Sequence, residues 1–256
     1  MKNQSKLKGK KVQNRTEWKK AIVLTAIIVI TVAAFITIVQ SESSSNSIQN
    51  EKAIGDFILV SNSILTESGR IVILFIGAEA CPFCAAESWS IVYALAQYGT
   101  WNGLSPVISN ATDSIPKVPG YTFANATLES SQVSFVEVEL TSTSWDQKLQ
   151  SLNSTESQLF REYDPSGSIP FLLIGGMYLH IGSAVSPYPL SNMSWSQCYN
   201  LSKSQNAFHD QVVSEASNIS QVINYVEGKY LSSSGASSVP TYPAPELFLG
   251  DISRLR

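Results

Sequence analysis

Two cysteines separated by two residues are the part of this sequence that could do chemistry. Cys81 and Cys84 enclose a Pro-Phe dipeptide, follow an apolar run at 71–77 and precede a helical pattern at 85–98. The apolar run predicts a buried strand that ends just before the pair. A thiolate at a helix N-terminus is stabilised by free backbone N–H groups and by the helix dipole. The pattern therefore predicts a redox-active pair that can close into a small disulfide ring.

A metal site is the main alternative for these thiols. The chain has only three cysteines, too few for a disulfide scaffold. A structural zinc site takes four ligands, usually in two spaced pairs. The remaining candidates, Cys198, His180 and His209, lack that spacing. We expect no metal and no cofactor, although metal delivery by the pair with His180 stays open. Otherwise His180 should be a partly exposed strand residue, Cys198 a small buried one and His209 a helix-surface residue.

The N-terminus predicts a membrane anchor. Residues 1–20 carry eight basic side chains and one acidic side chain, and residues 21–39 are almost entirely apolar and uncharged. At roughly 1.5 Å per residue, a helix over 21–39 is about long enough to span a bilayer. The positive-inside rule then predicts a cytoplasmic tail at 1–20 and places the later residues outside the cytoplasm. A cleaved signal peptide is the alternative, although its apolar region is usually only about 7–15 residues long.

The residues after the apolar segment have an acidic charge and possible N-glycosylation sites, and both features agree with a location outside the cytoplasm. The whole chain has a net charge of −3, and its basic residues are concentrated in the tail. The rest is acidic, which excludes a positive surface for nucleic acid. Six possible N-glycosylation sites follow the apolar segment, at Asn110, Asn125, Asn153, Asn192, Asn200 and Asn218. A chain rich in serine, threonine and asparagine also produces such sites by chance.

The residues after the anchor predict one α/β domain between two less regular segments. The expected parts are a Ser-rich linker at 40–52, a domain at 53–230 with an irregular insertion at 101–132, and a flexible tail at 231–256. After the cysteine helix, the patterns predict a strand at 133–140, a helix at 146–163, a β-hairpin at 171–181 opened by Pro170, and one or two helices at 195–230. Residues 51–69 leave strand and helix open.

This order of elements resembles the thioredoxin fold. The stretch from Gly77 to Trp89 is similar to the membrane-anchored archaeal and actinobacterial thioredoxin-like family catalogued as domain of unknown function family 929. Further similar stretches lie at 98–101, 133–139 and 167–171, and the resemblance covers roughly residues 55–225. The family name supplies a fold and a chemistry but no substrate.

The resemblance implies roles for individual residues. Cys81 corresponds to the exposed attacking thiol and Cys84 to the resolving thiol. Ile169 and Pro170 correspond to a cis-proline loop that faces the disulfide and pairs with substrate backbone. One position departs from the thioredoxin pattern, because Phe75 stands where thioredoxins carry a buried acid six residues before the first cysteine.

Two nearby acids are candidates for replacing that missing proton acceptor. Glu79 precedes the pair, and Glu87 lies one helical turn beyond Cys84. Either could take the proton of the buried thiol, and either could equally be a solvated surface acid.

These patterns together predict a membrane-anchored, extracytoplasmic thiol–disulfide oxidoreductase. Its expected partners are cysteine-containing surface or secreted proteins and a membrane redox partner that restores the disulfide. An oxidase or isomerase is favoured because no glutathione pool exists outside the cytoplasm, and a reductase fed across the membrane is the variant. The alternative is a non-catalytic binding module of the same fold with a structural disulfide.

Overall fold

The computed structural model describes residues 53–234. The predicted basic tail (1–20), membrane segment (21–39), linker (40–52) and most of the C-terminal tail lie outside the described residues. Within them, no helix is long and apolar enough to cross a membrane.

A mixed sheet forms the centre of the domain. Its strands are β1 (Ile58–Leu59), β2 (Thr66–Glu67), β3 (Arg70–Gly77), β8 (Val133–Glu139), β9 (Phe171–Ile174) and β10 (Tyr178–Ile181). The long strand β3 pairs in parallel with β8 on one side and antiparallel with β9 on the other. β10 follows β9 in an antiparallel hairpin, β1 pairs with β10, and β2 pairs with the start of β3. The prediction of a buried strand before the cysteines is confirmed, because all of β3 after Arg70 is buried.

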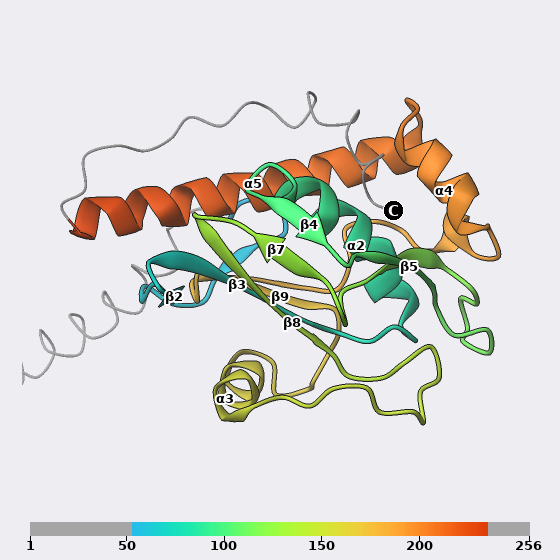
Figure 1. Cartoon of the computed structure of the whole chain (residues 1–256), viewed down its shortest axis with the longest axis horizontal. Coiled ribbons are helices and arrows are strands. Elements are labelled where there is room, and N and C mark those ends of the chain that lie inside the picture. The colour runs from blue at the N-terminus through green and yellow to red at the C-terminus, as the bar shows by residue number, and fades with distance from the viewer. Residues whose placement is uncertain (1–52, 235–256) are drawn as a thin grey trace, which may run out of the picture. The chain divides into compact units, whose positions relative to one another are not determined.

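Helices cover both faces of this sheet. They are α2 (Pro82–Leu95), α3 (Ser154–Tyr163), α4 (Trp195–Ser202) and α5 (Ala207–Ser234). In Figure 1, α2 and the long α5 lie on one side of the sheet and α3 on the other. The alternation of β3 explains both interfaces: Ile73 and Phe75 join the core formed with α2 and α5, whereas Leu74 and Ile76 pack with Phe160 of α3.

The α/β class and the order of elements around the cysteines agree with the prediction, but the insertion does not. Residues 101–132 are not irregular, because they contain two antiparallel pairs of short strands. These strands are β4 (Thr100–Asn102), β5 (Ser105–Ile108), β6 (Pro119–Thr122) and β7 (Thr127–Glu129). β6 lies against α2, where the indole N–H of Trp89 donates to the carbonyl of Pro119 over 2.9 Å. A side chain on Gly120 would meet the backbone of Ala85, so close packing requires glycine there.

Two predicted helix boundaries also differ. The helix expected from residue 146 begins at Ser154, because Asn153 caps it and forms a reciprocal capping box with Glu156. The preceding residues return toward β8, where the N–H of Gln150 bonds the carbonyl of Glu139 over 3.0 Å. At the C-terminus, α5 continues to Ser234 and so includes the first residues of the predicted flexible tail.

Candidate active site

The pair of cysteines lies at the start of α2, as the sequence predicts. Cys81 is the N-cap residue, and its Sγ accepts a hydrogen bond from the backbone N–H of Cys84 over 3.2 Å. Hydrogen bonding from the Cys84 side chain lowers the pKa of the Cys81 thiol, while burial acts in the opposite direction. Both residues are free thiols in this structure. The geometry therefore favours the Cys81 thiolate over the Cys84 thiolate.

The sulfur of Cys84 lies over the central strand. Cys84 is 3% exposed, and burial raises the pKa of its thiol well above the usual range. A Cβ on Gly77 would lie 3.3 Å from Cys84 Sγ and 2.5 Å from the ring of Phe75. The missing side chain of Gly77 thus leaves room for the aromatic ring and the thiol together.

Glu139 is the acid beside this buried thiol, and the sequence analysis did not identify it as a site residue. It ends β8 directly opposite Gly77 of β3, and paired residues of neighbouring strands point to the same face. The carboxyl group is 2% exposed; Oε1 accepts from the N–H of Phe123 over 3.3 Å, and Oε2 is buried without a hydrogen-bond partner. Burial raises the pKa of Glu139 to about 8, and its charge in turn raises that of Cys84.

The two acids proposed from sequence occupy other environments. Glu79 is half-buried and accepts from the hydroxyl of Thr122 over 2.6 Å. Glu87 is buried, and its Oε2 accepts from Ser183 Oγ over 2.9 Å and from the N–H of Ala184 over 3.1 Å. The ionisable groups that act most strongly on Glu87 are Glu215 and His180 rather than the thiols. Of these three carboxyl groups, Glu139 is the one whose charge is among the main causes of the raised pKa of the Cys84 thiol.

Cys81 differs from the expected exposed thiol, because it is only 4% exposed. The loop between β5 and β6 lies beside it: the N–H of Asn110 donates to the carbonyl of Ala80 over 3.0 Å, and the charge of Asp113 acts on the Cys81 thiol. This loop is fixed in turn by hydrogen bonds from the Asn110 amide to the carbonyl of Thr143 and from the indole of Trp145 to Asp113. Because of this packing, an atom of another molecule could reach Cys81 only if neighbouring residues moved.

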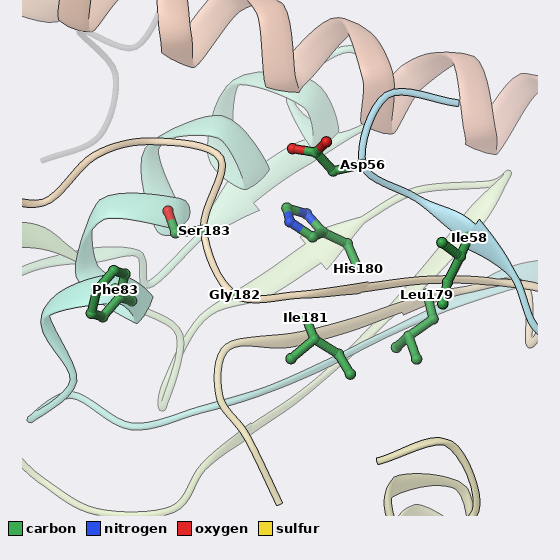
Figure 2. A pocket seen from close by; sticks show the side chains of 8 residues that line it. All are labelled: Asp56, Ile58, Phe83, Leu179, His180, Ile181, Gly182 and Ser183. Carbon is green, nitrogen blue, oxygen red and sulfur yellow. The ribbon is translucent and has the colours of Figure 1, made fainter. Parts of the chain in front are cut away.

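An open cavity of about 530 Å³ includes in its lining Phe83, the residue between Pro82 and Cys84 (Figure 2). Phe83 lines one end of the cavity, Ile58 lies toward the opposite end, and Ile181 lies between them. These three apolar side chains are 36%, 54% and 39% exposed, respectively. An exposed apolar surface of this kind is suited to contact with a segment of another polypeptide.

The Ile169–Pro170 peptide bond is cis. Pro170 is buried and its carbonyl accepts from the N–H of Gly182 over 2.8 Å, whereas Ile169 is half-buried between the two parts of the core. Within residues 53–234, the backbone N–H and C=O of Ile169 make no hydrogen bond.

The histidines and the third cysteine differ in how well they were predicted. Cys198 is fully buried in α4, as expected, and burial raises the pKa of its thiol to about 11. The prediction for His180 was wrong: it is 6% exposed, because β1 and α5 cover it, and its Nδ1 lies 3.1 Å from Glu215 Oε1. His209 is half-buried in α5, with Nδ1 2.7 Å from the carbonyl of Ser202.

The candidate glycosylation sites differ in accessibility. Four are exposed, at Asn125, Asn153, Asn192 and Asn200, and two are half-buried, at Asn110 and Asn218. The side chain of Asn218 lies against Gly55 and its amide donates to Glu215 Oε2 over 3.0 Å, so a glycan has least room there.

One comparison with known proteins gives a match. Residues 56–144 match the family described as Domain of unknown function (DUF929). The match supports the resemblance to that family and includes Cys81, Cys84 and Glu139, but it ends before the hairpin that contains Pro170. Searches of curated proteins and of solved structures find no match. The chemistry must therefore be argued from the site itself.

Proposed function

We propose that this chain is a thiol–disulfide oxidoreductase that acts on protein cysteines outside the cytoplasm, anchored to the membrane by residues 21–39. The observation that carries the proposal is the asymmetry of the pair. Cys81 caps a helix and has a lowered thiol pKa, whereas Cys84 is buried over the sheet beside Glu139 and has a raised one. An attacking thiol and a resolving thiol need this difference.

A thioredoxin-like fold is part of the proposal. Its support is the order of neighbouring strands β8, β3, β9 and β10, with β8 parallel to β3 and the hairpin antiparallel to it. α2 and α5 on one face and α3 on the other complete the arrangement. Under this fold, the unpaired backbone of Ile169 would pair with the backbone of the client.

The proposed direction is disulfide donation. A client thiolate attacks Sγ of Cys81 in the Cys81–Cys84 disulfide, a client–Cys81 bond forms, and Cys84 leaves as a thiolate that takes the proton of Glu139. A second client thiolate then attacks the client sulfur of the mixed disulfide and releases the Cys81 thiolate. The client loses two electrons and its dithiol becomes a disulfide, while the pair becomes a dithiol. A membrane-bound disulfide or quinone-linked partner would reoxidise it.

In the reverse direction, Glu139 acts as the base. The Cys81 thiolate attacks a client disulfide, and one client sulfur leaves as a thiolate while the other stays bonded to Cys81. Cys84 then gives its proton to Glu139 as it attacks Cys81 Sγ, the bond from Cys81 to the client breaks, and the second client sulfur leaves as a thiolate, so that the client is reduced and the pair oxidised. A carboxyl group with a pKa of about 8 can both accept and donate a proton near neutral pH. The same site therefore supports isomerisation as well as oxidation.

A second candidate function has one observation in its favour. Cys81 is 4% exposed, as a cysteine of a structural disulfide would be. The chain would then be a binding module, and the apolar cavity beside Phe83 would hold a partner without any exchange of disulfides.

Trapping of the mixed disulfide distinguishes the oxidoreductase from the binding module. In cells, the full chain with Cys84→Ser should accumulate disulfide-linked adducts with surface or secreted proteins, because Cys84 can no longer resolve them. Cys81→Ser should form none, and Cys198→Ser is the matched control that should behave as the unaltered chain does. Equal adduct levels in the Cys84→Ser and Cys81→Ser variants would reject the oxidoreductase and leave the binding module.

A further inference from the structure

A second cluster of reactive side chains lies on the same face of the sheet as the thiols but does not include them. Glu87 of α2, His180 of β10 and Glu215 of α5 each place a potential ligand atom within 4.8 Å of the others. All three side chains are almost completely buried, at 1%, 6% and 1% exposed. From this arrangement we infer that the three residues form a binding site for one divalent transition-metal ion, a role independent of the cysteine pair.

The oxygen atoms of the two carboxyl groups are arranged as metal ligands usually are. Glu87 Oε2 is held by Ser183 and Ala184, while Glu87 Oε1 is buried and has no hydrogen-bond partner. Glu215 Oε2 is held by the amide of Asn218, and its Oε1 faces His180 Nδ1 at 3.1 Å. Each carboxylate thus has one oxygen fixed by an outer hydrogen bond, as metal ligands usually have, and among the described residues the other oxygen of Glu87 has no hydrogen-bond partner.

The imidazole is also held in place. The ring of Phe57 packs edge-on against His180 with ring centroids 5.2 Å apart. Figure 2 shows the His180 ring directed to the side of β10 on which Asp56 lies, whereas Leu179 and Ile181 point to the other side. The imidazole of His180, the one nitrogen ligand of the cluster, therefore has a fixed orientation.

A divalent ion would balance the charge of both carboxylates, whereas without one His180 can pair only with Glu215. Two ionised carboxylates and a neutral imidazole carry a charge of −2, and burying them without compensation is costly. A divalent cation makes the group neutral without protonating any of the three ligands. One imidazole nitrogen with two carboxylate oxygens suits Zn²⁺ or Mn²⁺.

The imidazole and one of the two carboxylate ligands, Glu215, line open cavities. The cavity of about 530 Å³ reaches His180 and Ser183, and a second cavity of about 500 Å³ reaches Ala184 and Glu215. Asp56 lines both. Three protein ligands leave at least one coordination position for water or for a ligand that enters by these cavities.

Metal content of the full chain tests the inference. The host protein carries Cys81→Ser and Cys84→Ser, so that thiols of the pair cannot bind the ion. After removal of metal with a chelator, the host is dialysed against Zn²⁺ and, separately, against Mn²⁺, and bound metal is measured by mass spectrometry. We expect one ion per chain with at least one of the two metals. No bound ion above the buffer level with either metal would overturn the inference.

Matched variants locate the site. Glu87→Gln and His180→Asn in the host should weaken binding at least about tenfold, whereas Glu162→Gln, in an exposed position of α3, and His209→Asn should leave it unchanged. Circular dichroism checks that each variant is folded. Binding that survives both Glu87→Gln and His180→Asn would overturn the assignment. If these variants do not fold, Glu215→Gln is the third variant to test. In that case the Tm of the host must also rise with metal concentration as it takes up one ion per chain, and a Tm that does not rise would overturn the inference.

Discussion

Glu139 lies directly opposite Gly77 in the parallel pairing of β8 with β3, on the face of the sheet that the sulfur of Cys84 covers. The carboxyl group thus comes from the neighbouring strand rather than from the strand that leads into the cysteines. Phe75 of β3 stands where thioredoxins carry a buried acid, and its ring fills the space above Gly77. A buried acid therefore acts on the thiol of Cys84 from the strand next to the one that leads into the cysteines.

The first prediction concerns proton transfer by Glu139. Glu139→Gln should slow the attack of Cys84 on a mixed disulfide at Cys81 by about 100-fold or more, because the thiol loses its proton acceptor. In the unaltered protein the acceptor is the ionised carboxylate, so the rate should rise with pH through about 8 and then level. Stopped-flow release of a chromogenic thiol from Cys81 measures the rate.

Glu162→Gln is the control for this prediction, because it makes the same chemical change on the exposed surface of α3. If Glu139→Gln retains both the rate and the inflection near pH 8, Glu139 does not exchange the proton.

The second prediction concerns the thiolate of Cys81. Hydrogen bonding from the Cys84 side chain is the main cause that lowers the pKa of Cys81. Cys84→Ala should therefore raise that pKa and slow alkylation of Cys81 by iodoacetamide at neutral pH, where less thiolate would be present. Mass spectrometry of the labelled protein follows the reaction at Cys81. Alkylation at Cys81 that is as fast as in Cys198→Ala, the control, would show that Cys84 does not stabilise the thiolate.

The third prediction concerns packing at Gly77. Gly77→Ala should destabilise the protein by about 1–3 kcal/mol, because its Cβ would overlap the Phe75 ring and contact Cys84 Sγ. Gly228→Ala in α5 is the matched control: a Cβ there meets nothing within 4 Å, and alanine should stabilise the helix by about 0.5–1 kcal/mol. Urea unfolding measures both. Equal effects of the two substitutions would show that the space above Gly77 is not tightly filled.

Local patterns were sufficient for the elements around the thiols. The buried strand β3, the cysteine pair at the start of α2 and the hairpin of β9 and β10 each depend on neighbouring residues only, and each was predicted. The Asn153–Glu156 capping box was also a local signal for the start of α3, but it was overlooked.

The positions of Glu139 and His180 could not be predicted from neighbouring residues, because both depend on contacts between segments that are distant in the sequence. Glu139 becomes a site residue only through the register of β8 against β3, although its place on the less apolar face of the strand was visible in the sequence. His180 becomes buried only because β1 and α5, which are distant in sequence, cover it. The strands within 101–132 likewise depend on packing against α2 and the sheet.

The reduction potential of the Cys81–Cys84 pair tests the central claim most directly. The full chain would be equilibrated in buffers of defined dithiol and disulfide composition, and its free thiols would be trapped and counted, with Cys198→Ser as the background. Because the lowered pKa of Cys81 stabilises the reduced pair, we predict a potential between about −120 and −270 mV, the range of catalytic pairs. A potential far below about −300 mV would mean a structural disulfide and would contradict the oxidoreductase.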